Sequence, residues 1–379
     1  MADNILFIAK QYMKSYMNLS YLPRIYDRYC KNSTVNYNKV IFADAHSDRL
    51  TANMLPIYKR LSEQGYDIKN MCIDTSKLSS MELMKYMKTF MKEYATARYV
   101  FLSSYFLPAA SCNKRKETKV IELWHAGGML KKMGYDAKDD IPSYFKGNPA
   151  ANFDLVTVSA DFCIPAYESA FKLDKGVAVA TGIARTDLYY DDEFNKKCVD
   201  RFYNMYPNAI GKKICLFAPS FSGNAARPIC RSYTPEITKC FDRLSDEWFF
   251  VTKLHPHVEK RYPGVSCPLN TEELYAPCDL LITDYSSVVF DFMIYNKPFI
   301  LYAPDIKRYM KERGFYIEIS MLPAPVVKTA EGLEKLMRSD NWKRDPAEIE
   351  KCRGIYMEKC DGHAVDRILK TVGIDVKET

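Results

Sequence analysis

The sequence contains no run of about 18 apolar residues, so we expect no transmembrane helix. Asp3 stands before a short apolar run without a small-residue cleavage site, so the N-terminus does not resemble a signal peptide. The twelve cysteines are scattered, with no CxxC pair and no Cys/His group at zinc spacing. We therefore expect a reducing cytoplasm, cysteines packed in the core and no structural metal.

Other absences concern catalysis and partners. The chain has no P-loop and no DxD-like pair in a suitable place, so no dedicated metal site and no cofactor are evident. No recognised nucleic-acid motif is present, so we expect no nucleic-acid partner. The net charge is +7, which suits an anionic substrate or an anionic membrane surface, although general solubility explains it equally well.

The 379 residues are enough for two domains with full cores. Apolar runs alternate with helix-length segments, which indicates parallel α/β sheets. The predicted strands are 40–43, 70–74, 99–103, 120–124, 155–159, 177–180, 214–218, 248–254, 280–283 and 299–302. The predicted helices are 55–63, 79–94, 235–244, 331–338, 346–353 and 364–371, and the polar stretch 187–205 is expected to connect two domains. We thus predict two Rossmann-like domains, 1–190 and 191–379, with parallel sheets facing a cleft.

Residues 4–38 are rich in tyrosine, methionine and basic residues. A basic amphipathic helix of this kind could lie on a membrane surface. The more ordinary explanation is a helix that packs on the N-terminal domain and keeps its basic face in water. The basic residues concerned are Lys10, Lys14, Arg24, Arg28 and Lys31.

The stretch 279–302 is predicted to form a strand, a short turn, a helix to Asn296 and a second strand, which is the crossover unit of a parallel sheet. The turn holds Asp284, Ser286 and Ser287. Hydroxyls and free N–H groups at a helix N-terminus suit a phosphate. Ordinary helix capping explains the same residues.

Two of the five histidines lie at the ends of predicted strands. His125 is followed by a glycine pair that begins at Gly127 and then by Lys131 and Lys132. A histidine titrates near neutrality and can take a proton from an attacking hydroxyl, whereas glycine lets a ligand approach the backbone. The alternative is a histidine that merely packs on Trp124.

His255 also ends a strand, next to Lys253, and the two could hold a phosphate or protonate a leaving group. The alternative is an exposed histidine in a turn. Arg185 follows the strand at 177–180, where its guanidinium fork suits phosphate or, equally, could pair with Asp187 to fix the interdomain hinge. His46 lies between Asp44 and Asp48, and we expect it on the surface or the acceptor side.

Together these motifs resemble the CDP-glycerol glycerophosphotransferases of teichoic acid synthesis. The similarity is carried by WHAGGMLKKMG, GIARTD, KLHPH and TDYSSVVFDFMIYNKPFILY, and it extends from about residue 120 to 371. The resemblance implies a GT-B-like fold, a CDP-glycerol or CDP-ribitol donor and a lipid-linked saccharide acceptor. It implies that domain 1–190 lies on the acceptor side and that domain 191–379 binds the CDP donor. It also implies a peripheral location on the inner face of the cytoplasmic membrane.

The resemblance assigns roles as well. His125 would be the general base, and His255 would bind the pyrophosphate or assist the departure of CMP. The expected substrate contacts are Ser286, Ser287, Asp284, Lys131, Lys132, Arg185, Lys253 and Gly127. One departure from the family pattern concerns 218–222, which reads APSFS where members often carry APTWR. The missing arginine puts one phosphate contact in doubt, and Arg227 or Arg231 could replace it.

Two other functions fit the sequence. One is a GT-B glycosyltransferase or nucleotide-sugar epimerase, since one fold hosts many chemistries. The other is a non-catalytic, membrane-associated assembly protein. The sequence alone does not separate glycerol from ribitol donors, nor a primase from a polymerase.

Overall fold

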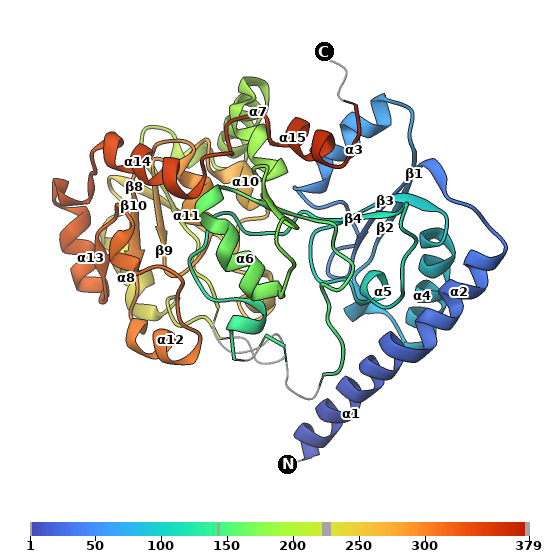
Figure 1. Ribbon diagram of the computed structural model, residues 1–379. Coiled ribbons are helices and arrows are strands. Elements are labelled where there is room, and N and C mark those ends of the chain that lie inside the picture. The colour runs from blue at the N-terminus through green and yellow to red at the C-terminus, as the bar shows by residue number, and fades with distance from the viewer. Residues whose placement is uncertain (1, 139, 142–144, 222–228, 376–379) are drawn as a thin grey trace. The chain divides into compact units, whose positions relative to one another are not determined.

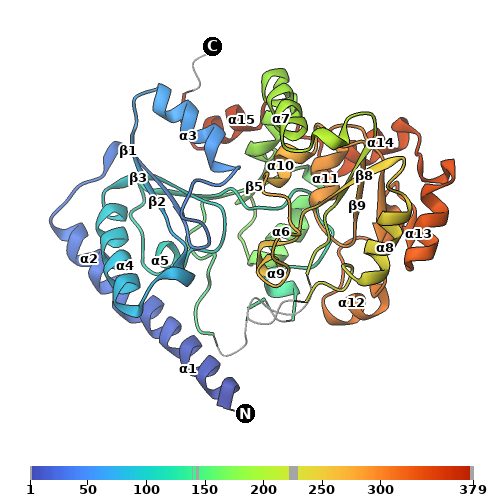
Figure 2. The same ribbon diagram turned by 180° about the vertical axis from the view of Figure 1, so that it is seen from behind.

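A computed structural model describes residues 2–138, 140–141, 145–221 and 229–375. The described chain forms two compact units. Unit 1 holds the described residues of Met1–His125, Gly134–Asp187 and His363–Thr379, and unit 2 holds those of Ala126–Met133 and Leu188–Gly362. Each unit carries a parallel β-sheet with helices around it (Figures 1 and 2). The domain boundary at 190/191 stays a prediction.

The sheet of unit 1 has the strand order β2-β1-β3-β4-β5-β6, and every neighbouring pair is parallel. Its strands are β1 (Asn36–Asp44), β2 (Asp67–Cys72), β3 (Ala97–Leu102), β4 (Lys119–Glu122), β5 (Leu155–Val158) and β6 (Ala178–Ala180). The last six residues of β1 are all buried, as expected for a parallel strand covered on both faces. The carboxyl ends of these strands therefore share one edge.

The helices of unit 1 are α1 (Ala2–Tyr16), α2 (Leu22–Lys31), α3 (Met54–Glu63), α4 (Ser80–Tyr94), α5 (Leu107–Ala110), α6 (Ile164–Phe171) and α15 (Ala364–Thr371). A π-helical turn, η1 (Met17–Tyr21), joins α1 to α2. Helix α4 starts with the predicted capping box, in which Ser79 Oγ accepts from the N–H of Glu82 and Glu82 Oε2 accepts from the N–H of Ser79. Helix α15 lies beside α3 (Figures 1 and 2), and both pack on Phe42 and Phe101 of the sheet.

The sheet of unit 2 has the order β11-β10-β9-β7-β8, again with every pair parallel. Its strands are β7 (Lys213–Phe217), β8 (Trp248–Thr252), β9 (Leu280–Thr283), β10 (Phe299–Tyr302) and β11 (Val326–Val327). Its helices are α7 (Asp192–Met205), α8 (Pro235–Arg243), α9 (Pro256–Glu259), α10 (Thr271–Leu274), α11 (Val288–Met293), α12 (Ile306–Glu312), α13 (Ala330–Met337) and α14 (Pro346–Tyr356). Trp248, Phe241 and Leu333 belong to a core cluster of this unit.

Short 3₁₀ segments complete the two units. They are η2 (Thr75–Lys77), η3 (Gly134–Asp136), η4 (Asp161–Cys163), η5 (Ala184–Tyr190), η6 (Pro207–Ala209), η7 (Ile319–Met321) and η8 (Asp340–Trp342).

Two local features differ from the prediction. The stretch 187–205, which was predicted to connect two domains, contains a helix that was not predicted, α7, which is capped by Asp191 and buries only Cys198 and Phe202. A helix that buries so narrow a stripe is mostly polar, which concealed it in the sequence. The helix after Ser287 ends at Met293, before the expected Asn296, because Asn296 adopts a left-handed φ of 51° that favours a helix end.

Helix α1 carries an unusual distribution of side chains. Where the structure describes the side chains of α1, the buried ones are polar, Gln11 and Ser15, whereas Tyr12, Met13 and Tyr16 are more than half exposed. Figure 1 shows α1 extending away from the sheet of unit 1. Among the described residues, no helix combines the length and the apolar character needed to cross a bilayer.

Candidate active site

In unit 1, polar side chains gather where strands β1, β3 and β4 end. Asp44, at the end of β1, accepts hydrogen bonds from the N–H groups of His46 and Ser47 through Oδ1, and from the hydroxyls of Ser103 and Ser104 through Oδ2, at 2.7–3.1 Å. The buried Asp44 therefore orders the loop after β1. His46 is exposed on that loop, as expected.

His125 follows β4 and is exposed to solvent. Its ring lies 4.3 Å from the ring of Trp124, at an interplanar angle of 36°. Packing on Trp124 and access to a substrate are thus compatible, because His125 stays exposed while its ring contacts Trp124. Its role as general base stays a prediction.

Glu122, the last residue of β4, is a polar residue that our sequence reasoning missed. It is fully buried, and burial raises its pKa to about 8. Its Oε1 accepts from the N–H of Trp124 at 2.9 Å, and its Oε2 is buried without a hydrogen-bond partner. A charged residue inside an apolar strand was the available signal, since such residues are seldom fully buried.

Arg185 is buried in unit 1. Its backbone N–H and its Nη1 both donate to Oδ1 of Asn53, each at 3.2 Å. Asp187 accepts from the N–H groups of Ala364 and Val365, at 2.9 and 2.8 Å, and so holds the start of α15. Within unit 1, Asp187 therefore ties the chain end to the segment after β6.

The glycine pair after His125 packs closely against protein side chains. A Cβ on Gly127 would lie 2.9 Å from Met357 Cε, and one on Gly128, whose φ is +60°, would lie 2.5 Å from the ring of Phe290. Both glycines belong to unit 2 with these partners. The lack of a side chain is thus required at Gly128 by packing and by its φ, whereas the flexible end of Met357 could shift to admit a Cβ on Gly127.

Lys131 and Lys132 are half-buried in the same segment. Lys131 forms a β-bridge with Phe315, and the N–H of Lys132 donates to the carbonyl of Gly314 at 3.1 Å. The backbone of both lysines is therefore fixed against residues 314–315 of unit 2, while their role in binding substrate stays a prediction.

Asp284 follows β9 and is buried. Its Oδ1 accepts from the N–H groups of Ser220 and Tyr285, at 2.8 and 2.6 Å, and its Oδ2 accepts from the hydroxyl of Ser232 at 2.8 Å. The carboxylate thus joins the ends of β7 and β9 to the segment before α8. We interpret Asp284 as a residue that orders the donor side.

Ser286 and Ser287 are half-buried at the start of α11. The hydroxyl of Ser286 accepts from the N–H of Val288 at a long 3.4 Å. Ser287 occupies the N-cap position in an α-helical conformation and forms no capping hydrogen bond through its side chain. Capping therefore accounts for these two hydroxyls poorly, which leaves them able to bind phosphate oxygens.

His255 and Lys253 follow β8. His255 is half-buried, and its ring lies 4.4 Å from the ring of Phe221. Lys253 donates from Nζ to the carbonyl of Cys267 at 2.8 Å. One donor of the ammonium is thus used, and an ammonium group has three.

Arg231 lies in a small pocket of about 10 Å³ that Ser220, Tyr285 and Asp305 also line. Its Nε makes no hydrogen bond and lies 3.6 Å from Asp305 Oδ2. Arg231 is thus the candidate for the missing arginine that the structure places beside the TDYSS turn. The other candidate, Arg227, lies outside the described residues.

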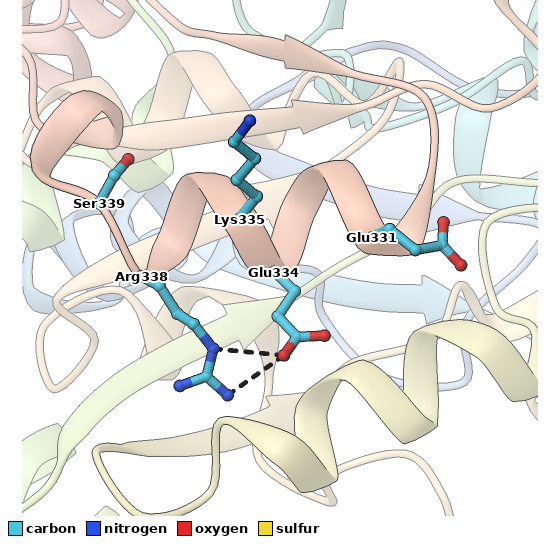
Figure 3. Close-up of a pocket in the computed structure, with 5 residues that line it drawn as sticks. All are labelled: Glu331, Glu334, Lys335, Arg338 and Ser339. Atoms are coloured by element: carbon cyan, nitrogen blue, oxygen red, sulfur yellow. Dashed lines mark hydrogen bonds and ion pairs between the residues drawn. The ribbon is translucent and has the colours of Figure 1, made fainter.

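A larger hollow of about 370 Å³ lies elsewhere, along α13 (Figure 3). It is lined by Glu331, Glu334, Lys335, Arg338 and Ser339. Arg338 donates to Glu334, one helical turn away, as the dashed lines in Figure 3 show. The hollow contains none of the predicted site residues, so we assign it no role. No group of three or more His, Cys, Asp and Glu side chains within the described chain could hold a metal ion.

Comparison with known proteins decides the family. The profile described as CDP-Glycerol:Poly(glycerophosphate) glycerophosphotransferase matches residues 25–373. The chain belongs to this family. The match confirms the resemblance read from the motifs and extends it well before residue 120. The predicted enzyme class, a CDP-polyol phosphotransferase, is confirmed with it.

Curated relatives of this chain act in teichoic acid synthesis. The chain is 30% identical to a teichoic acid ribitol-phosphate primase of Bacillus spizizenii. The alignment of 352 residues covers 88% of this chain and 90% of the relative. The chain is 28% identical to a poly(ribitol-phosphate) polymerase of the same organism, over 89% of this chain and 56% of the relative. A glycerol-phosphate primase of Bacillus subtilis is 30% identical, over 62% of this chain and 64% of the relative. The chain thus spans nine-tenths of the first relative and about 60% of the others.

Solved structures confirm the fold class. The wall teichoic acid polymerase TagF superimposes with a TM-score of 0.73 at 18% identity, over 96% of this chain and 97% of that chain. A UDP-GlcNAc 2-epimerase from Neisseria meningitidis gives a TM-score of 0.54 at 11% identity, over 90% of this chain and 99% of that chain. Both likenesses concern the fold alone, so they do not distinguish transferase from epimerase. The family match makes that distinction.

Proposed function

We propose that this protein transfers glycerol phosphate or ribitol phosphate from a CDP-polyol to a hydroxyl of a lipid-linked saccharide and releases CMP. The single observation that supports this most strongly is the family match over residues 25–373, which includes every residue to which we assign a role in the transfer reaction. The curated relatives include ribitol-phosphate and glycerol-phosphate enzymes, so both donors are candidates.

The reaction is a phosphoryl transfer. The acceptor hydroxyl attacks the phosphorus that bears the polyol, the bond from this phosphorus to the bridging oxygen breaks, and CMP leaves while a phosphodiester forms. In our proposal His125 takes the proton of the hydroxyl, because it is exposed and histidine is the side chain that most often serves as a general base in enzymes. His255 contacts the pyrophosphate or gives a proton to the departing CMP.

The donor phosphates would be held mainly by residues of unit 2. Ser286 and Ser287 offer hydroxyls that capping engages poorly. Lys131, Lys132 and Lys253 offer positive charge, and Asp284 holds the turn that presents the serines. In unit 1, Arg185 would stabilise charge near His125. Positioning and charge stabilisation dominate such reactions, because little covalent chemistry falls to the protein.

We further propose that the protein works at the inner face of the cytoplasmic membrane, with α1 as its contact. Helix α1 exposes Tyr12, Met13 and Tyr16 together with Lys10 and Lys14. Exposed aromatic and apolar side chains beside lysines suit the interface of an anionic bilayer. This arrangement favours the membrane-surface alternative for the N-terminal segment over packing on the domain.

The test is CMP release from CDP-glycerol and from CDP-ribitol, with a lipid-linked disaccharide as acceptor. We expect release from one of the donors, and we expect His125→Ala to lower turnover by at least about 100-fold while the affinity for the donor persists. Release that His125→Ala leaves intact would remove His125 as the base. Tight donor binding without release would favour an assembly protein, and turnover of a UDP-sugar would favour an epimerase or glycosyltransferase.

A further inference from the structure

Buried side chains hold both backbone polar groups of Trp124, the residue just before His125. The N–H of Trp124 donates to Glu122 Oε1 at 2.9 Å. The carbonyl of Trp124 accepts from Nδ2 of Asn53. Glu122 is fully buried and Asn53 is 3% exposed, so water does not compete for either contact. The two peptide units that flank the Cα of Trp124 are therefore both held by side chains of unit 1.

This restraint acts on a strained backbone. Trp124 has a φ of 48°, in the left-handed region, and bulky residues rarely adopt it because Cβ approaches the carbonyl oxygen too closely. Such conformations are unfavourable and persist where the surrounding structure holds them in place. The direction in which the chain leaves Trp124 sets where the imidazole of His125 points. The hydrogen bonds to Trp124 thus bear directly on that imidazole.

Asn53 has a second task at its other end. Its Oδ1 accepts from the backbone N–H and from Nη1 of Arg185, both at 3.2 Å. Asn53 stands at the N-cap of α3, yet its side chain makes no capping hydrogen bond. An amide can donate to a carbonyl and accept from a guanidinium at the same time, whereas a carboxylate can only accept. The residue type at 53 therefore matches both contacts.

We propose that Asn53 is a positioning residue for the transfer reaction: one amide fixes the Trp124 carbonyl and the Arg185 guanidinium together, and so sets the placement of His125. The proposal rests on the proposed function, in which His125 and Arg185 take part in the transfer. Asn53 acts through these residues and does not itself contact substrate.

Asn53→Asp tests the proposal most sharply. The aspartate has nearly the same shape and still accepts from Arg185, but it cannot donate to the Trp124 carbonyl and repels it. We expect kcat to fall about 10- to 100-fold, because small misplacements of a reacting group have effects of this size. We expect the KM for the CDP-polyol to change by less than about twofold. Asn53→Ala loses both contacts, so its kcat should fall at least as far as that of Asn53→Asp.

Asn152→Asp is the matched control in unit 1. The amide of Asn152 donates to the carbonyls of Ala109 and Cys112, at 2.8 and 2.7 Å. Neither Ala109 nor Cys112 is a predicted site residue. We expect this variant to lose thermal stability but to keep the kcat of wild type. If it loses kcat as Asn53→Asp does at an equal melting temperature, the effect is general loosening and the proposal is overturned.

Two further outcomes count against the proposal. Asn53→Asp with wild-type kcat would show that the Trp124 contact is not needed, and a raised KM at constant kcat would indicate donor binding instead. If Asn53→Asp does not fold, Asn53→Ser replaces it, since the serine side chain is too short for its hydroxyl to reach both partners.

A wild-type protein that releases no CMP would reject the proposed function itself. The side-chain NMR signals of His125 in Asn53→Asp would then decide whether Asn53 positions the imidazole ring.

Discussion

Arg231 and Asp305 face each other in unit 2, with Arg231 Nε 3.6 Å from Asp305 Oδ2. Asp305 also accepts a hydrogen bond from the hydroxyl of Tyr285, in the TDYSS turn, at 3.0 Å. The distance from Arg231 is long for a hydrogen bond, and Nε has no other partner. The guanidinium is thus held near the turn by charge without being fully engaged, which would let it exchange Asp305 for a phosphate.

Substitutions at this pair should change donor affinity in opposite directions. We expect Arg231→Ala to raise the KM for the CDP-polyol about tenfold, since hydrogen bonds to charged groups contribute about 1.5–3 kcal/mol. Asp305→Asn should lower this KM, because it frees the guanidinium. Steady-state kinetics with CMP release measures both.

The control for this pair is Arg308→Ala, which removes an exposed arginine paired with Glu312 on α12. It should leave the KM unchanged. An equal rise in KM for Arg308→Ala would mean that general positive charge, and not the position of Arg231, attracts the donor. An unchanged KM for Arg231→Ala would exclude Arg231 as the replacement for the missing arginine.

Ser286→Ala together with Ser287→Ala should raise the donor KM, by about tenfold, if these hydroxyls hold phosphate oxygens. Thr329→Ala is the contrasting variant, because Thr329 does cap its helix, accepting from the N–H of Gly332 at 3.0 Å. It should cost about 1 kcal/mol of unfolding free energy and leave the KM as it is. Should the double serine variant lose stability without a change in KM, the turn is a simple cap.

Much of the fold could be predicted because a buried parallel strand consists of consecutive apolar residues, which are visible in the sequence. The strand predicted at 280–283 matches β9, and the capping box at Ser79 marked the start of α4. Local signals of this kind depend on neighbours in sequence. Helix α7 was missed since it buries so narrow a stripe that its sequence is mostly polar.

The candidate site was predictable only in part, for a related reason. Strand ends located His125 and His255, since the residue after a buried strand lies at the sheet edge. The partners of Trp124 were not predictable. Asn53 lies 71 residues from Trp124 and 132 residues from Arg185, so only the folded sheet of unit 1 brings the three together. Long-range hydrogen bonds leave no periodic pattern in the sequence.

The stability of the protein should depend on pH through Glu122. Its folded-state pKa of about 8 lies above the ordinary value of 4.5, so the folded state binds this proton more tightly than the unfolded state. The stabilisation is therefore fully present below about pH 4.5 and is lost as the pH rises to about 8, at up to about 1.4 kcal/mol per pH unit. Glu122→Gln, which does not titrate, should remove this decline. Urea unfolding at pH 5, 6, 7 and 8 measures the difference.

A surface glutamate provides the control for that experiment. Glu117→Gln changes an exposed residue just before β4, so its unfolding curve should follow that of wild type at each pH. Parallel curves for wild type and Glu122→Gln across this range would show that Glu122 does not hold its proton in the folded state.

The last prediction concerns the proposed contact of α1 with the membrane. The full chain should sediment with vesicles that contain anionic phospholipid and far less with purely zwitterionic vesicles, because surface lysines each contribute about 1 kcal/mol near an anionic surface. Lys10→Glu with Lys14→Glu should therefore weaken binding by at least tenfold. Met13→Ser should weaken it further, since that side chain is 59% exposed and would leave water on binding.

Helix α4 of the same unit supplies the matched variants, because it also exposes lysines and a methionine. Lys85→Glu with Lys88→Glu makes the same change in net charge, and Met81→Ser removes a side chain that is 82% exposed. If α1 is the contact, these changes leave vesicle binding within about twofold of wild type. Equal losses from α1 and α4 would mean that net charge alone drives binding, and the absence of binding to anionic vesicles would reject the membrane proposal while leaving CMP release to decide the transfer reaction.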